Sequence, residues 1–387
     1  MISALGNNVP ESLLSLLQGK TGIGKINQLN TRYKDEFVAG EVKLSNNDLA
    51  DVITTSAYDY NRNTYLAMIA AQEAVIHSGI DMKDGMRTGL ISSTTVAGMA
   101  MTELHYKELF EKKDHLWVLD THDCADSTER IADYLGNIDY LTTISTACSS
   151  SANAIMLGSR MIKHGQLDRV IVGGVDALSK FTFNGFNTLM ILDREWCKPF
   201  DENRKGLNLG EGAAFLVIEG EQALAKRNGK ALAEVIGYAN CNDAFHQTAS
   251  SPEGYGATLA IQQTLAMSGL QPQQIDYINM HGTGTPNNDF SEGTAVRAVF
   301  GDNAPKFSST KGYTGHTLAA SASIEAIISV LTLQQQTIFP NLNFTTPIAD
   351  LNLTPVTEVL KTPVNTVLSN SFGFGGNCSS LLFKKTA

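Results

Sequence analysis

The chain has 387 residues, about twice the length of a common domain, so it can bury one large core or two fused ones. Charged residues make up only 18% of it and no low-complexity tract appears, which excludes disorder as the main state. The net charge of −10, from 29 basic and 39 acidic residues, argues against nucleic acid as a partner, because phosphate binding needs a basic face.

No apolar run approaches the roughly 18 residues that a membrane span needs. The first residues, MISALGNNVPESLL, lack the charged start and apolar stretch of a secretory signal. The five cysteines are an odd number, widely spaced and without a CxxC pair, which argues against a disulfide framework or a zinc site and fits a reducing compartment. We therefore expect a cytoplasmic enzyme with no membrane span and no bound metal.

Strand-like runs alternate with helical ones throughout, which is typical of an α/β protein. In the first half, an alanine-rich apolar run predicts a largely buried helix over 63–78, and a short run from Gly89 predicts a strand. The next elements are a strand, a helix and two strands, at 141–146, 151–165, 169–179 and 212–220.

The second half repeats this theme. A helix, two strands and a long helix are expected at 257–269, 276–282, 306–310 and 317–336. The chain then closes with two strands around the glycine-rich turn 370–377.

Two segments share one design, in which a strand leads through a polar turn into a helix of small residues. They read STACSSSANAIMLGSRMI and SSTKGYTGHTLAASASIEAIISVL. Small residues let helices approach closely, so both helices are expected to pack together in the middle of a layered structure. We expect two related α/β halves, 1–224 and 225–387, which divide near the polar break KRNGK. No linker rich in proline, glycine and serine separates them, so they should form one rigid body.

Cys148 lies in STACSSS, between a predicted strand and a predicted helix. A thiol at a helix N-terminus meets free N–H groups and the positive end of the helix dipole, which favour the thiolate. A sharp strand-to-helix turn also exposes the side chain, as in nucleophile elbows. The alternative is a small buried cysteine that fills a gap in the core.

Two histidines follow predicted strands in turns rich in glycine and threonine: His281 in MHGTGTP and His316 in TKGYTGH. A neutral imidazole can donate an N–H to a developing oxyanion or accept a proton, and two imidazoles can do both. Taken singly, each could instead be a histidine that hydrogen-bonds neighbouring backbone. Their matching positions favour the functional interpretation.

Charged residues accompany these histidines. Lys311 precedes His316, and Asp289 and Glu292 follow His281. A surface role is the default for such side chains. Glu325, however, lies in the apolar helix ASASIEAIISV, where burial demands an inward-facing partner.

The turn NSFGFGGN places Phe372 and Phe374 among glycines, which permit unusual dihedrals and close backbone approach. One interpretation is a tight turn between two terminal strands. The other is a hinged lid with an aromatic gate.

Together these motifs resemble the beta-ketoacyl-acyl-carrier-protein synthases, the elongating condensing enzymes of the thiolase superfamily. The resemblance covers nearly the whole chain. Its ordered motifs are TACSSS, PFDENRKGLNLGEGAA, HGTGTPNND, STKGYTGHTLAA and SNSFGFGG. It implies the thiolase-like layered αβαβα fold, with the nucleophile in the first half and both histidines in the second.

The resemblance implies that Cys148 takes the growing acyl chain as a thioester. Malonyl carrier protein would lose carbon dioxide, and the resulting carbanion would attack that thioester. His281 and His316 would stabilise the enolate, with Lys311 in the catalytic set. Acidic side chains would help to fix the histidines: Asp289, Glu292 and Glu325.

The same resemblance assigns the surroundings of the reacting groups. The backbone N–H groups of Cys148 and Phe374 would form the oxyanion hole for the acyl step, and Phe372 and Phe374 would gate the pocket. Thr283 and Thr285 would contact the phosphopantetheine arm. No other cofactor is implied, because the arm of the carrier protein brings the substrates.

Two positions match the walls of the family's acyl pocket. Val96, in SSTTVAGMAM, stands where related enzymes set the depth of that pocket, and Phe186, in NGFNTL, matches another wall. On its residue type alone, Val96 would be one more core aliphatic. A valine leaves more room than isoleucine or phenylalanine would, so medium to long acyl chains are expected.

The chain departs from the family pattern at two places. The strand that normally runs into the segment starting here as MISALGN is missing, so either the true start lies upstream or the first half lacks a core strand. The segment 49–62 is also poor in the basic residues that members present to acyl carrier protein. Docking is then expected to use Arg204 and Lys205, or to involve a less typical partner.

Close relatives differ at the same residues. Biosynthetic thiolases carry a second catalytic cysteine near the C-terminal glycine-rich loop, whereas here Cys378 lies beyond the loop core FGFGG. Initiating synthases replace one histidine by asparagine. The set of Cys148, His281 and His316 therefore selects the elongating class, acting on fatty acid, polyene or polyketide chains.

The expected assembly is a homodimer, or a heterodimer with a related ketosynthase-like subunit, because the acyl tunnel of the family usually ends at a twofold interface. The alternative function is that of a non-catalytic or chain-length-determining partner in such a heterodimer. The intact nucleophile and histidines argue against it.

Overall fold

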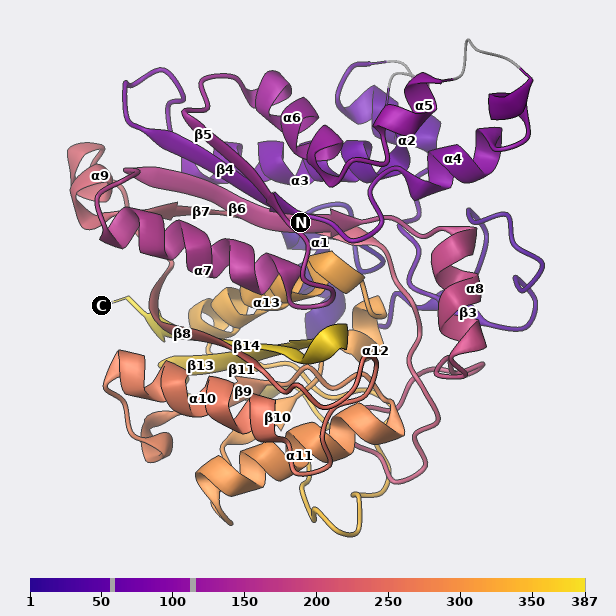
Figure 1. The fold of residues 1–387 in the computed structure, drawn as a ribbon. Coiled ribbons are helices and arrows are strands. Elements are labelled where there is room, and N and C mark those ends of the chain that lie inside the picture. Colours follow the sequence, from indigo (N-terminus) through magenta and orange to yellow (C-terminus); the bar gives the residue numbers. More distant parts are fainter. Residues whose placement is uncertain (56–59, 112–115, 387) are drawn as a thin grey trace.

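The computed structural model describes residues 1–55, 60–111 and 116–386. Within them, two five-stranded sheets are stacked with helices between them and outside them (Figure 1). The layers run helix, sheet, helix, sheet, helix. The thiolase-like layered αβαβα fold expected from the sequence is confirmed.

The first sheet is built by strands of the first half of the chain. Its central strand β6 (Arg169–Asp176) is buried along its whole length, as a continuous apolar run predicts. It pairs antiparallel with β7 and parallel with β4. The order across the sheet is β1 (Ile2–Ser3), β7 (Gly212–Glu219), β6, β4 (Thr88–Ser93) and β5 (Tyr140–Ile144).

The second sheet is built by strands of the second half. Its long hairpin of β13 and β14 is the pair of terminal strands expected around the glycine-rich turn. β9 and β10 run parallel to each other beside β13. The order across the sheet is β10 (Lys306–Ser308), β9 (Tyr277–Asn279), β13 (Thr366–Gly373), β14 (Asn377–Lys385) and β8 (Ala233–Asn242).

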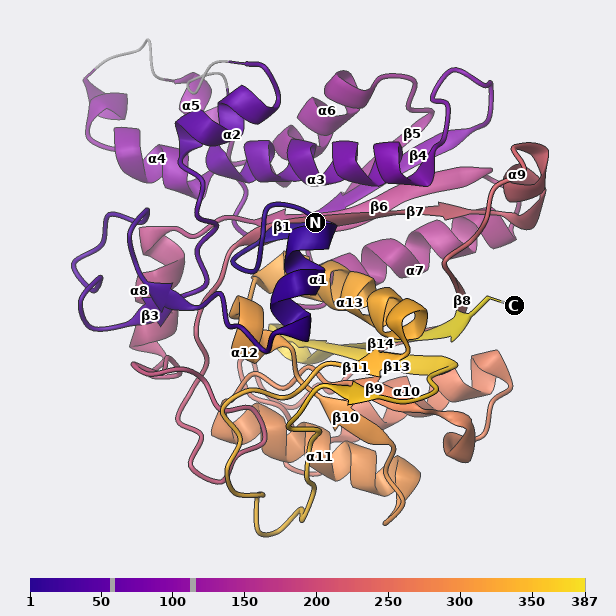
Figure 2. The same cartoon turned by 180° about the vertical axis from the view of Figure 1, so that it is seen from behind.

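Helices cover the outer face of each sheet (Figures 1 and 2). The helix predicted over 63–78 is present as α3; it starts after Asn61, whose side chain accepts the Thr64 N–H, and ends at Gly79 with a φ of 67°. The covering helices are α3 (Arg62–Ser78) and α6 (Cys124–Leu135) on the first sheet, and α10 (Tyr255–Ser268) and α11 (Pro286–Phe300) on the second.

The two helices of small residues, α7 (Ser150–Lys163) and α13 (Ser321–Gln335), lie between the sheets (Figure 1). The Ser151 hydroxyl donates to the Ala319 carbonyl at 2.5 Å and accepts the Ser323 N–H at 2.9 Å. The close packing predicted for these helices is therefore confirmed.

The expectation that no apolar run is long enough for a membrane span was wrong. Leu318–Gln335 is a helical stretch of 18 residues that passes this test by length and composition. In the fold 78% of that stretch is buried, so its apolar character is that of a central core helix.

A short strand lies within the segment MISALGN, and it leaves the expectation that the strand before this segment is missing as a prediction. Ile2 and Ser3 form β1, a short strand that pairs antiparallel with β7 at the edge of the first sheet. A strand of this length is too short to read from an alternating pattern.

Shorter elements complete the described chain. The remaining helices are α1 (Val9–Leu17), α2 (Asn46–Val52), α4 (Met99–His105), α5 (Trp117–Asp120), α8 (Lys180–Thr188), α9 (Glu221–Lys226) and α12 (Lys311–Thr314). Single 3₁₀ turns are η1 (Glu108–Phe110), η3 (Pro272–Gln274), η4 (Leu318–Ala320) and η5 (Phe374–Gly376). Two small ribbons pair β2 (Gly24–Lys25) with β3 (Val38–Ala39), and β11 (Thr337–Ile338) with β12 (Leu360–Lys361).

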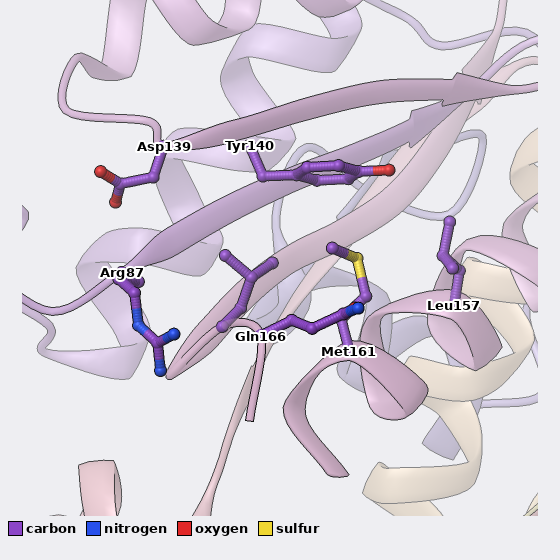
Figure 3. Close-up of a pocket in the computed structure, with 7 residues that line it drawn as sticks. Arg87, Asp139, Tyr140, Leu157, Met161 and Gln166 are labelled. Atoms are coloured by element: carbon purple, nitrogen blue, oxygen red, sulfur yellow. The ribbon is translucent and has the colours of Figure 1, made fainter. Parts of the chain in front are cut away.

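Strand β5 has a hydrogen-bonded neighbour, β4, on one side only among the described strands. A cavity of about 590 Å³ lies beside it, and Figure 3 shows Tyr140, Leu157 and Met161 around this space. A second hollow of about 400 Å³, between β5 and α6, is lined in part by Cys124 and Leu141. None of the predicted site residues lines either space.

Candidate active site

The turn that carries Cys148 connects β5 to α7, as the sequence predicts. Ala147, directly before the cysteine, has a φ of 53°, a strained value for a residue with a side chain. Gly373 lies against this turn so closely that an added Cβ would be 3.0 Å from the Thr146 carbonyl oxygen and 3.1 Å from the Cys148 nitrogen. The glycine-rich loop therefore abuts the backbone of the predicted nucleophile.

The Cys148 side chain is buried, with 5% of its surface exposed. Burial raises the pKa of its thiol to about 12, and the Asp176 carboxylate acts in the same direction. Lys311 and hydrogen bonds from the backbone N–H groups of Phe374 and Cys148 lower it. The backbone contacts at the helix N-terminus thus favour the thiolate, as expected, but desolvation of the thiol outweighs them.

The two histidine rings lie together. The centroids of His281 and His316 are 5.3 Å apart with an interplanar angle of 83°, and each side chain is 2% exposed. Burial is the largest cause that lowers both pKa values, and the positive charge of Lys311 adds to it. Both imidazoles are therefore neutral at physiological pH.

Lys311 fixes the orientation of His281. Its ammonium group lies 3.2 Å from His281 Nδ1, donates to the His281 carbonyl at 2.6 Å and pairs with Glu325 Oε1 at 2.5 Å. An ammonium group can only donate, so Nδ1 accepts and the ring proton is on Nε2.

His316 is held in the same tautomer by a different contact. Its Nδ1 accepts the backbone N–H of Leu318 at 3.3 Å and lies 2.9 Å from the Ser321 hydroxyl. A backbone N–H is an obligatory donor, so here too the proton is on Nε2. The site thus contains two neutral imidazoles whose Nε2–H groups remain as donors.

The predicted acidic residues are all buried, but they act on different parts of the site. Glu325 pairs with Lys311, and burial raises its pKa. Glu292 accepts the backbone N–H groups of His281 and Gly282, at 2.9 and 2.8 Å, and burial raises its pKa to about 7. Both thus position His281, one through Lys311 and one through the backbone.

Asp289 does not reach the histidine rings. It accepts the backbone N–H groups of Phe200 at 2.7 Å and of Gly284 at 3.2 Å, and so fixes the turn that carries Thr283 and Thr285. These two hydroxyls lie 2.9 Å apart. Asp289 therefore orders the predicted arm-binding turn rather than the imidazoles.

Both phenylalanines of the terminal turn face the site. The ring of Phe372 is 5.8 Å from that of His281, and Phe374 stacks on Phe186 at 5.7 Å and 18°. Phe186 and Val96 pack against the same apolar cluster, which includes Leu318. The structure thus joins the predicted gate to the predicted pocket walls.

The two predicted docking residues differ in exposure and in hydrogen bonding. Arg204 is half-buried and donates to the carbonyls of Asp201 at 3.0 Å and Pro286 at 2.9 Å, whereas Lys205 is exposed. Part of the basic-poor segment 49–62, residues 56–59, lies outside the described residues.

Within the described ranges, no three histidine, cysteine, aspartate or glutamate side chains are grouped as metal ligands.

Asp176 is a site residue that the sequence analysis missed. It ends β6, is fully buried and accepts hydrogen bonds from both Val96 N–H and Ala319 N–H. One signal could have found it, since a carboxylate at the end of the apolar run RVIVGGV must have partners inside the protein.

Family models match most of the chain. The beta-ketoacyl synthase N-terminal domain matches residues 1–223, and the beta-ketoacyl synthase C-terminal domain matches residues 232–345. The chain is 34% identical over 405 aligned residues to 3-oxoacyl-[acyl-carrier-protein] synthase 2 of Staphylococcus aureus strain N315, covering 99% of this chain and 96% of that protein. It is 32% identical to the Coxiella burnetii protein of the same name, covering 100% and 96%.

Solved ketosynthase structures also match the whole chain. The ishigamide ketosynthase/chain length factor matches with a TM-score of 0.93 at 28% identity, covering 100% of this chain and 97% of that one. A ketosynthase (ApeO) in complex with its chain length factor (ApeC) from Xenorhabdus doucetiae matches with a TM-score of 0.84 at 30% identity, covering 100% and 96%. A type II polyketide synthase acyl-carrier protein in complex with its ketosynthase (AntDE:AntF) matches with a TM-score of 0.90 at 25% identity, covering 100% and 97%.

Proposed function

The chain belongs to the beta-ketoacyl synthase family, and we propose that Cys148, His281 and His316 carry out its condensation reaction. The enzyme is an acyltransferase that joins a cysteine-bound acyl chain to a malonyl unit with loss of carbon dioxide, giving a 3-oxoacyl product. The observation that carries the assignment of roles is the pair of buried, neutral imidazoles with free Nε2–H groups beside a buried thiol.

In the acyl step, the sulfur of Cys148 attacks the thioester carbonyl of an acyl carrier protein. The carbonyl oxygen becomes an oxyanion, and the backbone N–H groups of Cys148 and Phe374, which already contact the sulfur, stabilise it. The bond to the carrier sulfur then breaks. Because the resting thiol is protonated, its proton ends on the departing carrier thiol, and the acyl group stays on Cys148.

In the second step, the carbon–carbon bond to the malonyl carboxylate breaks and carbon dioxide leaves. The electron pair moves toward the thioester oxygen as an enolate, to which His281 and His316 both donate an Nε2–H. The enolate carbon then attacks the Cys148 thioester. That attack forms the new carbon–carbon bond. Collapse of the adduct then breaks the bond between the acyl carbon and the cysteine sulfur, and the released thiolate takes up a proton from solvent.

Both substrates arrive on a phosphopantetheine arm, so the reaction as proposed needs no metal or other cofactor. The Thr283–Thr285 turn, fixed by Asp289, would contact the arm. Lys205 is the freer of the two proposed docking cations, because Arg204 also holds two loop carbonyls. The partner is an acyl carrier protein, as in the ketosynthase complex named above.

Among the described strands β5 has a neighbour on one side only, and its other edge supports a dimer. An unpaired strand edge exposes backbone groups that another strand can satisfy, and this edge is flanked by the two hollows described above. The partner would be a second copy or a related subunit, since two of the similar structures pair a ketosynthase with a chain length factor. A chain-length-factor role for this chain itself is disfavoured by its intact Cys148, His281 and His316.

Incubation with candidate acyl carrier proteins, followed by intact mass spectrometry, tests this function. The expected result is one acyl group on the wild-type chain and none on a Cys148→Ala variant. A wild-type chain that stays unmodified with acyl donors of every length would refute the assignment.

A further inference from the structure

We infer that Asp176 is a positioning residue that fixes the acyl-pocket turn and the His316 turn relative to each other. This inference rests on the proposed function. The Asp176 carboxylate does not itself contact substrate or the reacting atoms. It lies between two turns that carry the residues proposed to contact them. The two turns are Thr94–Ala97, which follows β4, and 316–319, which leads into α13.

On one side, Asp176 holds the turn that carries Val96. Its Oδ1 accepts the Thr94 hydroxyl at 2.6 Å, the Thr95 N–H at 2.9 Å and the Val96 N–H at 3.1 Å. Its Oδ2 accepts the Thr95 hydroxyl at 2.6 Å. The turn is strained, because Ala97 has a φ of 44°, and its N–H is held by the Thr94 hydroxyl.

On the other side, Oδ2 of Asp176 accepts the Ala319 N–H at 2.8 Å. The neighbouring Leu318 has a φ of 50°, and its N–H is the donor that sets the tautomer of His316. A strained turn keeps its shape only where its surroundings fix it. The same carboxylate therefore supports the pocket wall and the donor contact of an enolate-stabilising histidine.

The side chains repeat this link. Val96 packs against the apolar cluster that contains Leu318, so the pocket wall and the residue that orients His316 share one packed environment. Asp176 itself is fully buried at the end of β6. Three of its partners are backbone N–H groups, which cannot accept, so an aspartate can satisfy both turns and an asparagine cannot.

The test uses Asp176→Asn in the full chain and small thioesters of N-acetylcysteamine, which bypass carrier docking. Two rates are measured: carbon dioxide release from the malonyl thioester, and acylation of Cys148 by a short and a long acyl thioester. We expect kcat for decarboxylation to fall about tenfold or more, the scale of a lost hydrogen bond to a charged group, with little change in KM. The ratio of long-chain to short-chain acylation should change in the same variant.

A merely structural role predicts something else. Loss of folded protein lowers every rate by one common factor and leaves both KM and the chain-length ratio unchanged. Asp276→Asn is the matched control, because Asp276 also accepts backbone N–H groups, of Asn365 and Thr366, but at the start of β9 and β13, the ends opposite to the site. It should leave both activities at the wild-type level.

Thr95 provides a second variant if Asp176→Asn fails to fold. Thr95→Val removes one donor to Oδ2 and should reproduce the two effects in weaker form, and Thr95→Ser, which keeps the hydroxyl, should restore them. Wild-type rates and ratios in Asp176→Asn, or in Thr95→Val where the former does not fold, would overturn the inference. A wild-type chain that releases no carbon dioxide from the malonyl thioester would instead refute the proposed function.

Discussion

Replacing Lys311 by methionine tests the buried ion pair behind the histidines. Lys311 is 1% exposed and Glu325 is 3% exposed, so neither group has water as an alternative partner. Without the ammonium group, the carboxylate keeps only a weak contact at 3.5 Å with the Ser371 hydroxyl. Leaving one partner of a buried pair unpaired costs about 3–5 kcal/mol, a large part of the stability of a typical domain.

The pH dependence of this loss has a definite sign. An unfolded glutamate titrates at about pH 4.3. Burial raises the pKa of Glu325 in the folded protein, and loss of Lys311 raises it further. Between these two pKa values the folded variant binds more protons than the unfolded one, so its stability falls as pH rises. The free energy of unfolding of the variant therefore lies further below that of the wild type at about pH 8 than at about pH 5.

Urea unfolding followed by circular dichroism at both pH values measures this difference in the free energy of unfolding. The double variant Lys311→Met with Glu325→Gln removes the stranded charge, so it should regain much of the stability at the higher pH. It should not regain decarboxylation, because His281 still lacks the donor that fixes its tautomer. An equal deficit at both pH values, or a double variant no more stable than the single one, would refute the reasoning.

Further predictions address the reacting groups, the pocket and the assembly. Cys148→Ala should abolish acyl-enzyme formation with the fold intact, and a thioester on another cysteine of that variant, seen by peptide mass spectrometry, would contradict the assignment. His281→Ala or His316→Ala should cut malonyl decarboxylation by about a hundredfold, the scale of a lost oxyanion donor, and slow acylation less; wild-type carbon dioxide release from both would show them to be structural. Val96→Phe adds strain of roughly 1–3 kcal/mol, so acylation by long donors should fail while short donors still react. An equal loss of acylation rate for both donors would show that Val96 has only a packing role. Analytical ultracentrifugation at micromolar concentration should show a dimer, alone or with a related subunit, and a monomer in both samples would exclude it.

Much of the fold could be predicted from periodicity. The apolar runs at 63–78 and 169–179 became the helix α3, which is buried over its first half, and the central strand β6, which is buried along its whole length. Strand ends were less predictable. The strand expected at 276–282 stops at Asn279, where the backbone turns so that Glu292 can accept the N–H groups of His281 and Gly282.

Most residues that the structure brings together at the site were named from the sequence, but their electrostatics were not predicted. The position of Cys148 at a strand-to-helix turn followed from the sequence, whereas the raised pKa of its thiol depends on burial by segments far along the chain. The partners of Asp176 could not be predicted for the same reason, since they lie in two turns separated from it by 80 to 143 residues. Local patterns carry no record of such contacts.

The condensation itself is the most direct test of the account. The wild-type chain is supplied with an acyl carrier protein and with malonyl carrier protein labelled with ¹³C at the free carboxyl group. We predict release of labelled carbon dioxide in equal amount to a 3-oxoacyl carrier protein whose chain is longer by one two-carbon unit. Labelled carbon dioxide without chain extension, or extension that persists after Cys148→Ala, would contradict it.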